Sequence, residues 1–105
     1  MYCYQTQLTS LDISKNTALT DLSCTRNQLT SLDVSKNVVL KLLECPNNQL
    51  TNTALNNLFG TLHSNDNIYT YWDYIPGKYI VIRDNPGIND CNRGIAESKG
   101  WTIKD

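Results

Sequence analysis

The chain has 105 residues, and nine basic side chains against ten acidic ones leave a net charge of −1. That length fits one modest domain, and the balanced charge gives no reason to expect nucleic acid or an anionic membrane as partner. No apolar run approaches the ~20 residues of a membrane-spanning helix, and no signal-peptide pattern follows Met1. Thirteen leucines are matched by thirteen asparagines, although asparagine is a poor interior residue for helices and strands.

The first half of the chain is an internal repeat. Cys3, Cys24 and Cys45 recur with a 21-residue period, and the segments 3–23 and 24–44 are identical at 12 of 21 positions. A third copy begins at Cys45 and ends near residue 51. Alternation around each cysteine predicts a short strand whose equivalents stack about 4.8 Å apart, with leucines and cysteines inward.

Asparagines follow the strands at fixed places. A chain that turns leaves backbone groups unpaired, and an amide side chain can pair with them. We therefore expect each 21-residue coil to have two extended sides and two corners marked by asparagine. The corner residues are Asn16, Asn27, Asn37, Asn48 and Asn85.

The periodicity changes after residue 51. Leucines and a phenylalanine at helical spacing predict a helix over 53–63, with an N-cap among residues 51–53. A second helix is predicted over 89–99, with Asn89 or Asp90 as its cap and Gly100 as its stop. Its inward residues would be Cys91, Ile95 and Ala96.

The strand pattern returns between and after these helices. Ile80, Ile82 and Asn85 have the spacing of a repeat strand with its corner, and Trp101 and Ile103 follow one repeat period after the two isoleucines. We therefore predict five stacked strands. They are centred near Cys3, Cys24, Cys45, Ile82 and Ile103.

The spacing Leu19-x-x-Leu22-x-Cys24-x-x-Asn27-x-Leu29 resembles the leucine-rich-repeat family. The 21-residue length and the segment 29–37 are similar, more narrowly, to bacterial surface repeats of the internalin type. The resemblance implies an α/β fold: a right-handed leucine-rich-repeat solenoid, with a short parallel strand ladder and two helices in a C-terminal cap. The single domain 1–105 would comprise repeats over 1–51 and a cap over 52–105, with an aromatic insertion at 64–78.

The resemblance also implies a function and a location. It indicates non-catalytic recognition of a protein, or of a glycan, by a bacterial cell-surface or secreted protein. The alternative is a structural spacer or cap of a longer array, with no ligand of its own. Because Met1 aligns with the middle of a strand, we expect either a fragment of a longer array or a short protein that self-associates through its uncapped N-terminal edge.

Several kinds of chemistry find little support. The 21-residue cysteine spacing favours a reduced, inward thiol ladder over zinc, although a disulfide between adjacent rungs stays open. His63 is the sole histidine and is expected at a helix end rather than beside a thiol. The oxygen-rich stretch 84–90 is interpreted as a turn at 85–87 rather than a calcium loop. No enzyme activity, cofactor or metal is predicted.

Two surfaces are candidate binding sites. Outward strand positions differ from copy to copy, and repeat proteins bind along such faces; a plain solvated sheet is the alternative. These positions are Tyr2, Tyr4, Ser23, Thr25, Arg26 and Glu44, with Pro46, Gln5, Asn47, Thr20 and Lys41 in the equivalent or flanking places. Leu42 breaks the inward pattern and is either an exposed contact or packed against 64–78.

The second surface is the insertion 64–78. Clustered aromatic side chains suit protein contacts or stacking on sugar rings, but they can equally fold back over the first helix. The aromatic residues are Tyr69, Tyr71, Trp72 and Tyr74.

Overall fold

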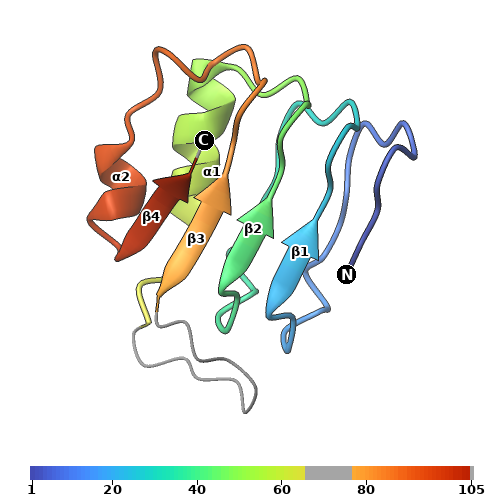
Figure 1. Ribbon diagram of the computed structural model, residues 1–105. Coiled ribbons are helices and arrows are strands. Elements are labelled where there is room, and N and C mark those ends of the chain that lie inside the picture. The colour runs from blue at the N-terminus through green and yellow to red at the C-terminus, as the bar shows by residue number, and fades with distance from the viewer. Residues whose placement is uncertain (66–76, 105) are drawn as a thin grey trace.

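The computed structural model describes residues 1–65 and 77–104 (Figure 1). The fold is α/β, with a four-stranded parallel sheet in the order β1-β2-β3-β4 and two helices, which confirms the expected class of parallel sheet with helices. The strands are β1 (Asp21–Ser23), β2 (Leu42–Glu44), β3 (Lys78–Val81) and β4 (Trp101–Lys104), and the helices are α1 (Asn52–Thr61) and α2 (Gly94–Glu97). Among the described residues, no helix has the length and apolar character needed to cross a membrane.

The sequence period sets the register of the first strands. Leu22 of β1 lies opposite Leu43 of β2, one repeat period further along the chain, and Leu43 lies opposite Ile80 of β3. The predicted first strand is reduced to a single bridge between Tyr2 and Ser23. The first coil nevertheless makes a strand-like hydrogen bond with β1, because the Cys3 N–H donates to the Ser23 carbonyl at 2.9 Å.

The last strand corrects the predicted register. Ile80 pairs with Ile103 and Lys78 pairs with Trp101, so a 23-residue offset replaces the predicted 21-residue one. A shift by two positions keeps the same side chains on the same face of a strand. Trp101 therefore still points inward, where it is 2% exposed and its indole N–H donates to the His63 carbonyl at 3.0 Å.

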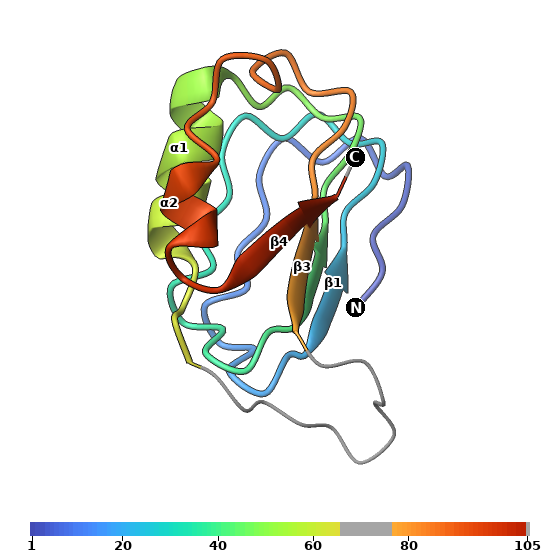
Figure 2. The same cartoon turned by 60° about the vertical axis from the view of Figure 1, so that its left-hand side comes forward.

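The core lies between the inner face of the sheet and the elements behind it. Figure 2 shows both helices on one side of the sheet, behind β3 and β4, while extended segments cover β1 and β2. Inward rows of leucine, isoleucine and cysteine fill this space. The row positions are Leu22, Leu43 and Ile80, and then Cys24, Cys45 and Ile82, all at most 1% exposed.

A ladder of asparagines joins the corners after the strands. The Asn48 Oδ1 accepts the Leu29 N–H at 3.0 Å, and its Nδ2 donates to the Cys24 carbonyl at 3.0 Å. Asn27 and Asn85 make the equivalent bonds to the coils that precede them. The predicted pairing of corner amides with the backbone is confirmed for Asn27, Asn48 and Asn85.

The second corner also uses an asparagine. Asn37 is fully buried, and its Nδ2 donates to the carbonyls of Ile13 at 3.1 Å and Asn16 at 2.9 Å. Its Oδ1 is buried and has no hydrogen-bond partner among the described residues. Asn37 therefore links adjacent coils through its amide nitrogen alone.

The two helices match their predictions to different degrees. α1 begins after the N-cap Thr51, whose Oγ1 accepts the Ala54 N–H at 3.2 Å, and it buries the predicted apolar face. The second helix, predicted near 89–99, is present, but α2 is a single turn over Gly94–Glu97, so the predicted length is wrong. The N-cap is Arg93, which makes no side-chain cap bond, rather than Asn89 or Asp90. Gly100, with φ of +85°, ends the turn as predicted.

Candidate functional site

The outer face of the sheet carries the predicted strand-face residues in ordered rows. One row runs in register across the strands through Tyr2, Ser23, Glu44, Val81 and Lys104. A second row continues beyond the strand ends, since the Gln5 N–H donates to the Thr25 carbonyl and the Arg26 N–H to the Pro46 carbonyl. The side chains of Tyr4 and Thr25 belong to this second row. The structure therefore brings all six predicted strand-face residues onto one surface.

Aromatic and cationic side chains gather at the N-terminal side of this face. Tyr2 is 80% exposed and Tyr4 is 52% exposed. The Arg26 guanidinium donates to the Tyr4 hydroxyl at 3.3 Å and lies 5.9 Å from the centre of its ring. Ser23 and Thr25 share a hydrogen bond at 3.1 Å. The N-terminal side of the face thus presents two accessible aromatic rings, and the Arg26 guanidinium contacts that of Tyr4.

A second aromatic–cation pair stands on the same face and was not predicted. The Lys104 ammonium lies 4.3 Å from the centre of the Tyr79 ring, on β4 and β3 respectively. Tyr79 occupies an outward position next to the inward Ile80, which is the sequence signal that could have identified it. Lys104 could be placed only with the 23-residue offset.

Two flanking candidates are not exposed. Lys41 is 4% exposed, and its backbone N–H donates to the Thr20 carbonyl at 2.7 Å. Pro46 is also buried. Glu44 and Leu42 are half-buried, and Leu42 lies between Asp21 and Tyr79 in the outward row. The accessible part of the face therefore lies around Tyr2, Tyr4 and Arg26, with Lys104 at its other side.

The residue immediately before the corner asparagine position that follows a strand has a positive φ. Equivalent positions in four coils, Gln5, Arg26, Asn47 and Asp84, have φ between +52° and +59°. Side chains other than asparagine, aspartate and glycine adopt this conformation at an energetic cost. Arg26 is thus held in a strained corner while its guanidinium contacts Tyr4. Within residues 1–65 and 77–104 no cluster of three acidic, histidine or cysteine side chains could hold a metal ion.

The cysteines are free thiols buried to different depths. Cys24 and Cys45 are inaccessible, while Cys3 and Cys91 are half-buried. Burial, and next to it the neighbouring Cys3 thiolate charge, raises the pKa of Cys24 to about 12. Burial likewise raises the pKa of Cys45 well above its ordinary value. A protonated thiol is a poor nucleophile, so these two groups act as small apolar side chains.

His63 is engaged by backbone groups at the end of α1. Its Nδ1 accepts the Asn65 N–H at 3.1 Å, and its Nε2 lies 2.7 Å from the Leu40 carbonyl. Nε2 must then carry the proton and donate. The ring also lies edge-on to Trp101, with centroids 5.5 Å apart. These contacts connect the helix end to the sheet, a structural role.

The aromatic insertion cannot be placed on this surface. Its four predicted residues lie outside the described residues; they are Tyr69, Tyr71, Trp72 and Tyr74. No protein-family model, curated protein or solved structure matches the chain.

Proposed function

We propose that the chain is a leucine-rich-repeat solenoid that recognises a protein, or a glycan, at a bacterial cell surface without catalysing a reaction. The fold proposal rests on the 21-residue offset between β1 and β2, and on the asparagine ladder that ties successive coils. Stacked short coils with a continuous strand face are the architecture that such repeats form.

One observation carries the functional proposal: inward rows repeat their residues, whereas outward rows do not. Inward, Cys24 follows Cys3 and Leu43 follows Leu22. Outward, Tyr2, Ser23 and Glu44 differ while remaining in register. Inward side chains are constrained by packing, so variation at accessible positions marks the surface on which different contacts can be built.

The chemistry of the face fits a protein or carbohydrate partner. Tyrosine rings offer large amphipathic contact areas, and they stack on sugars or pack against apolar side chains. Arg26 adds a forked donor that suits carboxylates. The face thus combines tyrosines with an arginine, residue types that are enriched at protein interfaces.

Binding measured with matched variants tests this proposal. The chain is immobilised and screened against a displayed protein library and a glycan array, and any ligand is then titrated against three proteins: the parent chain, the double variant Tyr4→Ala with Arg26→Ala, and Lys36→Ala. Lys36 is exposed but lies at the corner remote from the outward rows. We expect the double variant to weaken binding at least tenfold and Lys36→Ala to leave it unchanged. Equal affinities for all three proteins would contradict the strand-face site.

The alternative is a spacer or cap with no ligand of its own. The internal pairing of Ser23 with Thr25 and of Arg26 with Tyr4 is compatible with a solvated sheet that satisfies itself. If neither screen yields saturable binding, the spacer becomes the better account of the chain.

A further inference from the structure

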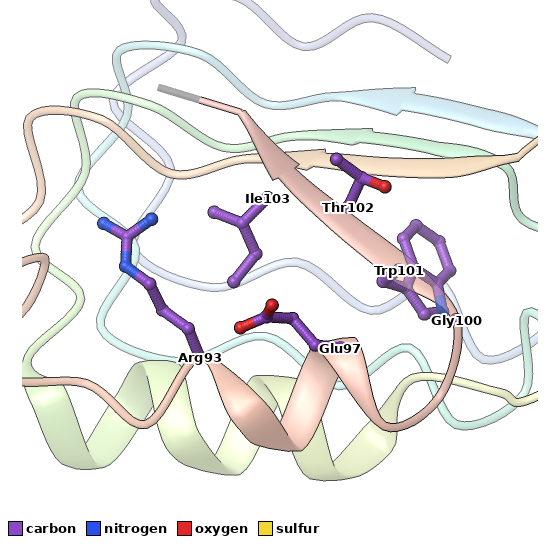
Figure 3. A pocket seen from close by; sticks show the side chains of 6 residues that line it. All are labelled: Arg93, Glu97, Gly100, Trp101, Thr102 and Ile103. Carbon is purple, nitrogen blue, oxygen red and sulfur yellow. The ribbon is translucent and has the colours of Figure 1, made fainter.

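A second surface, distinct from the strand face, lies along the outer edge of β4. Among the described residues, β4 is the outermost strand on that side of the sheet. Beside it is a hollow of about 430 Å³ lined by residues of β4 and α2. In Figure 3, Ile103 points from the strand into the space above the helix, and Arg93 and Glu97 rise from the helix side.

The hydrogen-bond directions of the sheet determine what this edge offers. In a parallel strand the backbone groups of successive residues point alternately to the two neighbouring strands. The Tyr79 N–H donates to the Lys41 carbonyl and the Val81 carbonyl accepts from Cys45, so both residues face β2. Ile80 therefore faces β4, where it lies opposite Ile103.

The same alternation applies to β4. The residues that flank Ile103, namely Thr102 and Lys104, direct their backbone groups to β3. Trp101 and Ile103 direct theirs outward. The edge thus presents a donor and an acceptor at each of two positions, spaced as a further parallel strand requires.

The inward side-chain row is also open at this edge. Leu22, Leu43 and Ile80 are each at most 1% exposed, because a neighbouring rung covers them on both sides. Ile103, the fourth rung, is half-buried and faces the hollow. An apolar side chain on a further strand would cover Ile103 in the way that Ile103 covers Ile80.

The outward row supplies a charge. Lys104 is exposed on the outer face, next to Tyr79. An acidic side chain directly opposite it on an added strand would form a cross-strand pair, whereas a basic one would be repelled. The position therefore favours a carboxylate in the residue that follows the inward apolar one.

We propose that the β4 edge binds an extended segment of another protein as a fifth parallel strand. The segment has apolar side chains at alternate positions opposite Trp101 and Ile103, and a carboxylate opposite Lys104. Its backbone pairs with the outward groups of Trp101 and Ile103. Its inward side chain fills the hollow between β4 and α2.

Amide hydrogen exchange followed by NMR tests this proposal. The probe is the peptide acetyl-Ser-Val-Thr-Ile-Glu-Val-Ser-amide, added to the chain at millimolar concentration. We expect exchange at the Ile103 and Trp101 amides to slow at least tenfold. The Lys104 amide, which already pairs with β3, serves as the internal control and should not change. A peptide with lysine in place of glutamate should slow exchange less.

A pair of variants separates edge pairing from general stability. Ile103→Pro removes the outward N–H while leaving the Thr102 and Lys104 groups that bond β3, and proline is tolerated on edge strands. It should weaken peptide binding at least tenfold, with the Lys104 amide still protected. Ile103→Val keeps the N–H and should stay within about threefold of the parent.

Three results would overturn the proposal. One is unchanged Ile103 exchange at saturating peptide. Another is an Ile103 amide that is already protected from exchange without peptide. Protection that is the same at every protein concentration would mean that another part of the chain occupies the edge. Protection that increases with concentration would mean that a second copy occupies it. The third is peptide binding that Arg26→Ala abolishes and Ile103→Pro does not, which would assign the peptide to the strand face.

Discussion

Replacing Asn48 by alanine is the sharpest test of what holds the coils together. Asn48 is 3% exposed and makes bonds to both the preceding coil and its own. Its Nδ2 donates to three carbonyls, those of Cys24, Cys45 and Pro46, at 3.0–3.2 Å. Its Oδ1 is the acceptor for the Leu29 N–H.

The cost follows from which groups are left without a partner. All three carbonyls keep a second donor: Asn27 Nδ2 for Cys24, Asn85 Nδ2 for Cys45, and the Arg26 N–H for Pro46. The Leu29 N–H has no other acceptor within residues 1–65 and 77–104. One buried, unpaired donor costs about 1–3 kcal/mol, and the weakened carbonyl bonds and small void bring our expectation to about 2–3 kcal/mol. For a domain of this size, the melting temperature should fall by about 10–20 °C.

Urea unfolding monitored by circular dichroism measures this loss. The matched control is Asn57→Ala, because Asn57 is exposed on α1 and its replacement should change the unfolding free energy by no more than about 0.5 kcal/mol. If the two variants differ by less than about 0.5 kcal/mol, the asparagine ladder does not stabilise the stack and the reasoning fails.

Further substitutions probe three other features. A Cβ at Gly87 would overlap the Asn52 backbone nitrogen, so Gly87→Ala should lower the unfolding free energy by more than about 3 kcal/mol in thermal melting. Gly60 has open space around it, so Gly60→Ala should instead raise the unfolding free energy by up to about 1 kcal/mol by stabilising α1. The Cys24 pKa is raised from 9.0 to about 12, so its stabilising effect is complete below pH 9 and is lost as the pH rises toward 12. Over that range Cys24 alone should lower the unfolding free energy by up to about 1.4 kcal/mol per pH unit, so Cys24→Ala should reduce the slope in urea titrations from pH 8 upward and leave the part that comes from Cys45. Arg26→Asn and Arg26→Ala both lose the contacts with Tyr4, but only asparagine tolerates the positive φ, so Arg26→Asn should have the higher unfolding free energy by about 0.5–1 kcal/mol; equal values in denaturant titration would contradict strain at that position.

The sequence predicted those features that repetition or local spacing encodes. Register between β1 and β2 follows from the identical residues of successive copies, and α1 follows from one apolar helical face. The function of Asn27 and Asn48 also followed from their place after a strand. In each case the pattern lies within one element or between equivalent positions.

Features that depend on later packing could not be predicted. Offsets of 21 and 23 place Trp101 on the same face, so side-chain alternation could not choose between them. With the shorter offset Lys104 would stand opposite Arg83, and its pairing with Tyr79 would not arise. The burial of Lys78 could not be predicted either. Its ammonium donates to backbone carbonyls, among them that of Lys99 at 2.7 Å, and a backbone acceptor leaves no signal in the residue types of the sequence.

The asparagine ladder gives the stack a polarity. Each ladder asparagine satisfies an N–H of the coil before it: Asn27 serves Leu8, Asn48 serves Leu29, and Asn85 serves Leu50. Detaching the first coil would leave only the Asn27 amide, which water can solvate at the newly opened end. Detaching the Asn85 corner would strand the Leu50 N–H inside the core. Local opening should therefore begin at the N-terminal coil and advance toward α1, so that the C-terminal coils remain closed longest.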